Sequence, residues 1–259
     1  MKPPIPPLLF AGFLLVGMLA LLEAGRRLGI NSRQKGLQAE QSNLGIIEGA
    51  IFALFGLVIA FTFSGAVSRF NEKRMLIAEE VNAIETAYLR LNLISEDAQP
   101  GLRQLFRQYV DSRAETYLRL PNMEAAEMEI AKSKRLQETI WVQAIAGTLL
   151  PRSHPDAGKL LLPALNNMID IATTRTMALR AHPPTIIYLL LLGLSLICSL
   201  LAGYRMSLGP CRSWLHILSF AFITVITVYV ILDIEYPRAG LIRLEAPDQV
   251  LLNIRDRMR

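Results

Sequence analysis

Acidic side chains beside long apolar stretches are the residues of this sequence whose chemistry stands out. Glu48 lies near the start of one such stretch, and Asp233 and Glu235 follow the end of another. A carboxylate at the mouth of a membrane-spanning helix attracts cations or pairs with a nearby arginine. The alternative is a solvated carboxylate at a helix end, and the pattern leaves both interpretations open. We therefore treat the three acids as candidate pore-mouth or structural residues.

Groups for catalysis or metal binding do not accompany these acids. His154, His182 and His216 are scattered along the chain without the spacing of metal ligands. The sequence contains no glycine-rich phosphate loop and no nucleophile motif. The pair Glu79-Glu80 falls in an amphipathic stretch and is interpreted as part of a solvated helix face. We therefore expect that the protein is not an enzyme and that it binds no cofactor and no metal.

Four apolar runs are long enough to position these residues at a bilayer, and they cover residues 5–22, 44–68, 185–204 and 214–232. A transmembrane helix needs roughly 20 apolar residues. Because the backbone must satisfy its own hydrogen bonds in lipid, each run is expected to be a helix. Glu48 is the one formal charge in the four runs, although 19% of all residues are charged. This distribution excludes a soluble enzyme, a secreted disulfide-stabilised domain and a disordered chain.

The segment between the second and third runs has a helical pattern. Ile77, Val81, Ile84, Tyr88 and Leu91 recur at steps of three and four, which predicts an apolar seam on one helix face. Since no stretch alternates with period two, we expect an all-α integral membrane protein with four transmembrane helices. The predicted parts are a first helix pair, a cytoplasmic helical domain, a second helix pair and a cytoplasmic tail, over residues 1–68, 69–183, 184–232 and 233–259.

Basic residues predict the orientation. Eleven flank the membrane on the side that holds both termini and residues 69–183, against six on the other side. The positive-inside rule places that first side in the cytoplasm. The net charge of +5 does not indicate a nucleic-acid partner, because residues 69–183 hold 15 basic and 14 acidic residues. The expected partner is the lipid bilayer.

The second run carries two stripes of residues at helical spacing. Small residues, which let another helix approach closely, form the first stripe: Gly45, Gly49, Ala53, Gly56, Ala60 and Ser64. Bulky apolar residues form the second stripe: Ile51, Phe55, Ile59 and Phe63. One interpretation is that both stripes pack against neighbouring helices or lipid. The other is that this helix lines a pore, with the bulky stripe as a constriction that gates by dewetting.

Several local segments resemble the bestrophins and, more closely, the bacterial family called bestrophin-like, over roughly residues 44–245. The segments are Glu48-Gly49-Ala50, Phe61-Thr62-Phe63-Ser64-Gly65-Ala66, Ser68-Arg69-Phe70, Glu80-Val81-Asn82-Ala83-Ile84, Thr86-Ala87-Tyr88-Leu89-Arg90, Leu162-Pro163-Ala164-Leu165-Asn166, Ile169-Asp170 and residues 233–242. The tail keeps Ile234, Glu235 and Pro237 in step with a bestrophin tail motif, while Tyr236 and Arg238 depart from it.

The resemblance implies a homopentameric anion channel in the bacterial inner membrane, with the second helix lining a hydrophobic neck. Bacterial relatives also pass cations, and the acidic calcium clasp of animal bestrophins has no clear counterpart here. The main functional hypothesis is thus a homo-oligomeric channel for inorganic ions, with anions expected. The alternative is a membrane-anchored interaction or sensory protein that docks partners through residues 69–183 and has no pore.

Overall fold

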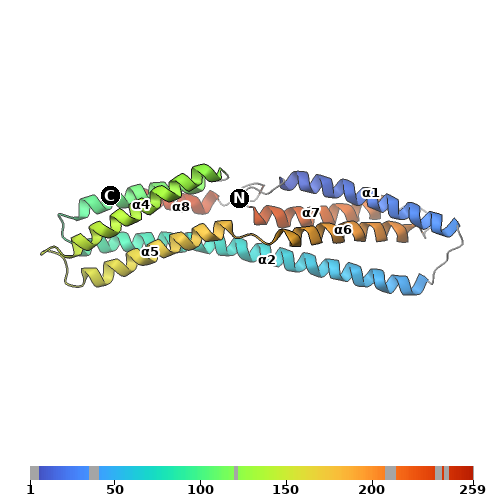
Figure 1. The fold of residues 1–259 in the computed structure, drawn as a ribbon, viewed down its shortest axis with the longest axis horizontal. Helices are drawn as coiled ribbons and strands as arrows, with labels where there is room; N and C mark the ends of the chain where they lie inside the picture. The colour runs from blue at the N-terminus through green and yellow to red at the C-terminus, as the bar shows by residue number, and fades with distance from the viewer. Residues whose placement is uncertain are drawn as a thin grey trace. The chain divides into compact units, whose positions relative to one another are not determined.

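The computed structural model describes residues 6–34, 41–119, 122–207, 214–236, 241 and 245–258, with the backbone alone for residues 41–44, 180 and 245–249. In these ranges the chain is helical and contains no strand. The elements in order are α1 (Pro7–Gln34), α2 (Gln41–Arg90), the 3₁₀ turn η1 (Leu91–Leu93), α3 (Gln99–Leu118), α4 (Met123–Thr148), α5 (Ala157–Arg180), α6 (Thr185–Met206), α7 (Trp214–Glu235) and α8 (Glu245–Arg257) (Figure 1). The predicted all-α class is confirmed.

The chain divides into two compact units, each with its own core. The membrane unit comprises residues 2–70 and 182–242, and the polar unit comprises residues 71–181 and 243–259. Helix α2 contributes residues to both. The predicted domain boundaries and the cytoplasmic location of the central segment remain predictions.

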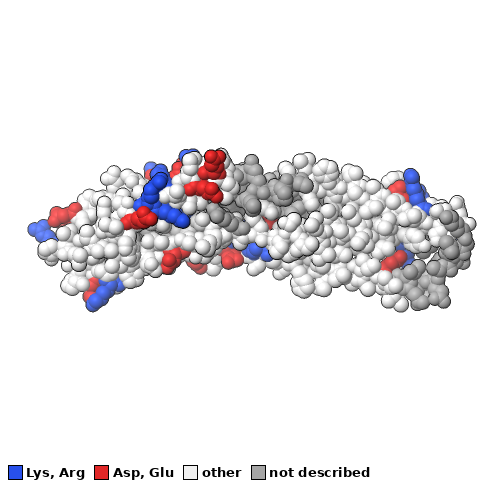
Figure 2. All heavy atoms as spheres, viewed as in Figure 1, with Lys and Arg blue, Asp and Glu red and all other residues white. Residues whose placement is uncertain are grey.

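The membrane unit contains four helices that are long and apolar enough to cross a bilayer, and these are α1, the first part of α2, α6 and α7. Their presence confirms the four predicted apolar helices. Helix α1 packs most extensively on α6 and next on α7. On the face shown in Figure 2, charged side chains largely avoid the middle of this unit. The turn predicted at Gly209-Pro210 lies outside the described residues.

Glycines set the close contact between α1 and α6. A Cβ added to Gly25 would collide with the backbone at Leu200, and one added to Gly203 would collide with the backbone at Leu22. Only a residue without a side chain allows the two backbones to approach this closely, which is the usual role of glycine between membrane helices. This pair was not singled out from the sequence.

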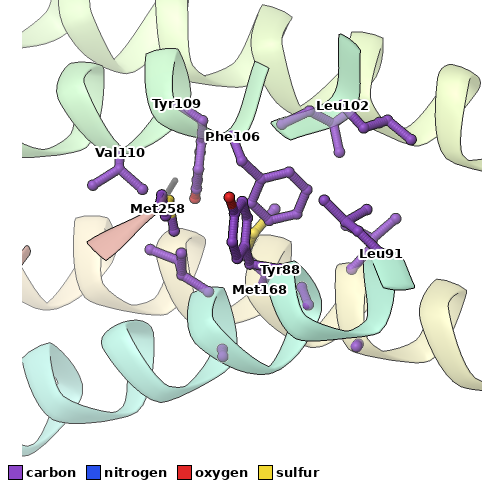
Figure 3. Packing of buried hydrophobic residues seen from close by; sticks show 14 of the residues in the cluster. Tyr88, Leu91, Leu102, Phe106, Tyr109, Val110, Met168 and Met258 are labelled. Atoms are coloured by element: carbon purple, nitrogen blue, oxygen red, sulfur yellow. The ribbon is translucent and has the colours of Figure 1, made fainter. Parts of the chain in front are cut away.

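The polar unit has a core built from α3, α4, α5, α8 and the second part of α2. Figure 3 shows Tyr88 from α2 packed with Phe106 from α3 and Met168 from α5. The rings of Tyr88 and Phe106 meet edge to face with centroids 5.7 Å apart. The seam predicted from Ile77 to Leu91 is confirmed, because all five of its side chains are buried.

Helix α8 completes this core from the far end of the chain. Its Leu251 and Ile254 are buried, as is Met258 immediately after the helix. The helix packs on α3, and Arg255 and Arg257 add ion pairs to Asp111 and Glu85. The sequence prediction described residues 233–259 only as a basic tail and missed this helix.

Candidate functional site

Helix α2 is the least covered of the four candidate spans. Only 6% of the residues in its most apolar window are buried, compared with 28% in α1, 28% in α6 and 44% in α7. The helix carries apolar residues on all of its own sides, so hydrophobicity alone does not select an inner face. The packing does select one, because Phe55 lies in the core of the membrane unit while Leu57 is half exposed.

The predicted bulky stripe lies mainly on the inner side of α2. Phe55 is 5% exposed and packs in the core of the unit, and Ile51 and Ile59 are partly buried against that core. Phe63 is 41% exposed. The burial of Phe55 therefore favours the packing interpretation for that residue. Phe63 is the member of the stripe whose side chain is exposed.

The predicted small-residue stripe faces outward. A Cβ added to Gly49 or Gly56 would meet no atom within 4 Å, and Ala53, Ala60 and Ser64 are exposed. Gly45 lies near the guanidinium of Arg205. A helix that packed closely against Gly49 or Gly56 would therefore have to come from another molecule.

Ion pairs tie the part of α2 in the membrane unit at both ends. Near its start, Glu48 faces Arg205 of α6, with Nε 3.6 Å from Oε2. Near its end, Arg69 reaches Glu235 of α7, with Nη2 2.8 Å from Oε2. The Glu235 side chain is 1% exposed and also lies 3.3 Å from His182 Nδ1. A buried carboxylate needs such partners, so the geometry gives Glu235 a structural role.

Asp233 is also buried at the end of α7. Its Oδ1 accepts a hydrogen bond from the backbone nitrogen of Leu241 at 2.9 Å, and its exposed fraction is 2%. The carboxylate thereby satisfies a backbone donor of the segment that follows the helix. All three predicted acids thus make contacts inside the membrane unit: Asp233 with Leu241, Glu235 with Arg69 and Glu48 with Arg205.

A buried charge cluster lies in the core of the polar unit, formed by Glu80, Arg113, Tyr117 and Arg175. Arg113 Nε donates to Glu80 Oε1 at 2.5 Å, and Arg175 Nη1 donates to Glu80 Oε2 at 2.5 Å. The Arg175 guanidinium lies over the Tyr117 ring, 3.4 Å from its centroid. Glu80 is completely buried, whereas Glu79 is exposed. The prediction of a solvated face was therefore wrong for Glu80.

Electrostatics keep the groups in this cluster, and the neighbouring Tyr109, in defined charge states. Burial lowers the pKa of the Arg113 guanidinium, but its interactions with Tyr117 and with the carboxylate of Glu80 outweigh burial, so the net pKa is raised. Burial raises the pKa of Tyr109 to about 12, against an opposing effect of Arg113. At neutral pH Arg113 is therefore charged and the Tyr109 hydroxyl is protonated.

The sequence agrees with this architecture. Residues 11–246 match the family model of the Bestrophin-like domain. The chain belongs to the Bestrophin-like family. No curated protein matches it significantly.

Solved structures similar to this Bestrophin-like protein include bacterial bestrophin homologues. A variant of the homologue from Klebsiella pneumoniae is 17% identical, with a TM-score of 0.62 over 94% of this chain and 98% of that one. A second variant of the same homologue has 19% identity and a TM-score of 0.57 over 93% and 98%. A structure described as a membrane protein is 18% identical, with a TM-score of 0.62 over 94% and 98%. At these identities the similarity establishes the fold.

Sequence reasoning about this Bestrophin-like chain missed the buried charge cluster. Its members come from three helices and are separated by up to 95 residues. One signal was available, since Glu80 lies within the apolar seam between Ile77 and Val81. A carboxylate at such a position indicates a buried partner of opposite charge.

Proposed function

We propose that this protein is a homo-oligomeric ion channel of the bestrophin type, with α2 lining the pore. The single observation that carries the proposal is the exposed apolar face of α2, the least covered of the four candidate spans. In an isolated chain this face would contact only lipid. In a ring of copies, the same face surrounds the axis. Family membership supports this interpretation.

The proposed lining follows the outer face of α2 at steps of three and four. It comprises Ala53, Leu57, Ala60 and Ser64, all exposed in the membrane unit. Leu57 is the bulky member and would form the narrowest apolar ring, where a pore gates by dewetting. Phe63 borders the same face and is proposed as a second contributor. For Ile51, Phe55 and Ile59 the proposed role is packing behind the lining.

The proposed assembly uses the small residues of the same helix. Gly49 and Gly56 leave open space beside the backbone, so α2 of an adjacent copy can approach closely there. A homopentamer is proposed from the family resemblance. Because Glu48 and Arg69 anchor α2 to α6 and α7 of its own chain, each copy would present the lining face in a defined rotation.

The proposed location is the bacterial inner membrane, with both termini and the polar unit in the cytoplasm. The excess of basic residues on that side supports this orientation. Inorganic anions are the proposed permeant ions, in line with the bestrophin resemblance.

Purified full-length protein in liposomes tests the proposal. We expect anion flux, and we expect Leu57→Ser to increase it because a hydroxyl makes the constriction easier to hydrate. Leu189→Ser is the matched control, since Leu189 is similarly exposed (55% against 50%) but lies on α6. Light scattering in detergent should give a single oligomer for wild type and both variants.

Two results would contradict the proposal, the first for the channel itself and the second for the lining by α2. One is a monomer without flux, which would favour the membrane-anchored interaction protein. The other is an oligomer whose flux responds equally to Leu57→Ser and Leu189→Ser, because the lining assignment would then be wrong.

A further inference from the structure

A cavity opens in the polar unit between α3, α4 and α5, and its volume is about 190 Å³. The polar groups around it come from all three helices: Arg113 from α3, Ser133, Lys134 and Gln137 from α4, and Thr173 and Thr176 from α5. A water molecule occupies about 30 Å³ in the liquid. The cavity therefore has room for a small ligand with several atoms.

The charge of the cavity is positive. Arg113 and Lys134 line it, and no aspartate or glutamate is among its lining residues in the described part of the chain. Arg113 is 2% exposed, yet it is one of the residues that line the cavity. Lys134 also lines the cavity and is exposed, so it adds a second cation that solvent reaches.

The hydrogen bonds of Arg113 leave one of its nitrogens available. Nε donates to Glu80 Oε1, while Nη2 donates to the Tyr117 hydroxyl and, at 3.4 Å, to the Ala172 carbonyl. Among the described residues no acceptor bonds Nη1. The fixed contacts hold the guanidinium plane, so Nη1 presents preorganised donors rather than a flexible charge.

The hydroxyl groups around the cavity have their own donors occupied. Ser133 donates to the Ile130 carbonyl at 2.9 Å, Thr173 to Ile169 at 3.0 Å and Thr176 to Ala172 at 2.8 Å. Their oxygen atoms still accept hydrogen bonds. A suitable ligand therefore carries negative oxygens for Arg113 and Lys134 together with a hydroxyl group that can donate.

We propose that this cavity binds a phosphate group, as free hydrogen phosphate or as a small phosphomonoester. Hydrogen phosphate combines negative oxygens, which a guanidinium recognises, with a P–OH donor for the threonine or serine oxygens. In a phosphomonoester such as glycerol phosphate the phosphate is mainly a dianion at neutral pH, and a hydroxyl of the alcohol part supplies that donor. Sulfate has the same shape and charge at neutral pH but lacks that donor. The site is independent of the proposed channel, because all of its residues belong to the polar unit.

Calorimetric titration of the full-length protein in detergent tests this site without any measurement of flux. Inorganic phosphate and glycerol phosphate are the probes, with sulfate and chloride at equal ionic strength as comparisons. We expect saturable binding of at least one phosphate probe and at least about tenfold weaker binding of sulfate. Saturation by glycerol phosphate alone would assign the site to a phosphomonoester.

Two matched pairs of variants locate the binding. Lys134→Glu and Thr173→Glu place a carboxylate at the cavity, whereas Arg135→Glu and Thr174→Glu place one on the adjacent exposed position that does not line it. We expect the first member of each pair to weaken phosphate binding about tenfold or more by charge repulsion, and the second to change it less than about threefold. All four positions are exposed, so the substitutions leave the buried core intact. Thermal unfolding verifies that each variant is folded.

The proposal is overturned if neither phosphate probe binds saturably, or if sulfate or chloride matches phosphate. It is also overturned if the control variants weaken binding as much as their partners at the cavity. A protein that binds phosphate but conducts no ions would refute the channel and retain this site, so the two proposals fail separately.

Discussion

Replacing Glu80 with glutamine should destabilise the polar unit strongly. The carboxylate is completely buried and contacts Arg113 and Arg175, each at 2.5 Å. Glutamine has nearly the same shape but removes the negative charge between the two guanidinium groups. Loss of one partner from a buried ion pair costs about 3–5 kcal/mol. Because the glutamine oxygen still accepts one hydrogen bond, we expect a value near the lower end, about 3 kcal/mol.

The assay is thermal unfolding of the full-length protein in detergent, followed by the helical circular dichroism signal. For a chain of about this size, 1 kcal/mol shifts the midpoint by roughly 2–4 °C, so Glu80→Gln should lower it by about 6–12 °C. Glu79→Gln is the matched control, because Glu79 is adjacent and exposed. It should change stability by no more than about 0.5 kcal/mol.

A double-mutant cycle separates the charge interaction from the general effect of a core substitution. Arg175→Gln in the Glu80→Gln background removes one of the two facing cations, so the double variant should be more stable than the sum of the single effects predicts. We expect a coupling of about 0.5–3 kcal/mol. Equal midpoints for Glu80→Gln and Glu79→Gln, or strict additivity in the cycle, would refute the reasoning.

Three further predictions concern packing and pH. Gly203→Val should destabilise the α1–α6 contact by about 1–3 kcal/mol or more, because the valine side chain would collide with the backbone of α1. Gly193→Val is the control, since a Cβ added there meets open space, and it should have a much smaller effect in the same thermal assay. Leu251→Ala should cost about 2–5 kcal/mol by leaving a cavity under α8, whereas chemical denaturation of the exposed Leu252→Ala should show little change. Burial raises the pKa of Tyr109 from 10.0 to about 12, so its neutral form stabilises the fold below pH 10.0 and this contribution is lost as the pH rises toward 12. The difference in stability between wild type and Tyr109→Phe should therefore vary with pH over that interval, and a constant difference would contradict the assignment.

Local pattern was sufficient for much of the architecture. The four apolar runs predicted the four candidate spans because a bilayer demands about 20 apolar residues regardless of what packs beside them. The seam from Ile77 to Leu91 predicted which side of α2 and η1 faces the core of the polar unit. The prediction was possible because apolar residues recur there at helical spacing, while the charged residues fall mainly on other sides. Helix α8 escaped prediction because the short apolar set of its Leu251 and Ile254 and the following Met258 becomes informative only when α3 is beside it.

The sequence by itself therefore determined which segments are apolar helices and where charge is concentrated, because both depend on composition and on the helical period. Only the tertiary structure decided which side of α2 is covered. That helix is apolar on every side in its membrane span, so the burial of Phe55 and the exposure of Leu57 follow from the helices packed against it. The tertiary structure also decided the state of Glu80, since a carboxylate is buried only where distant residues such as Arg113 and Arg175 supply the compensating charge.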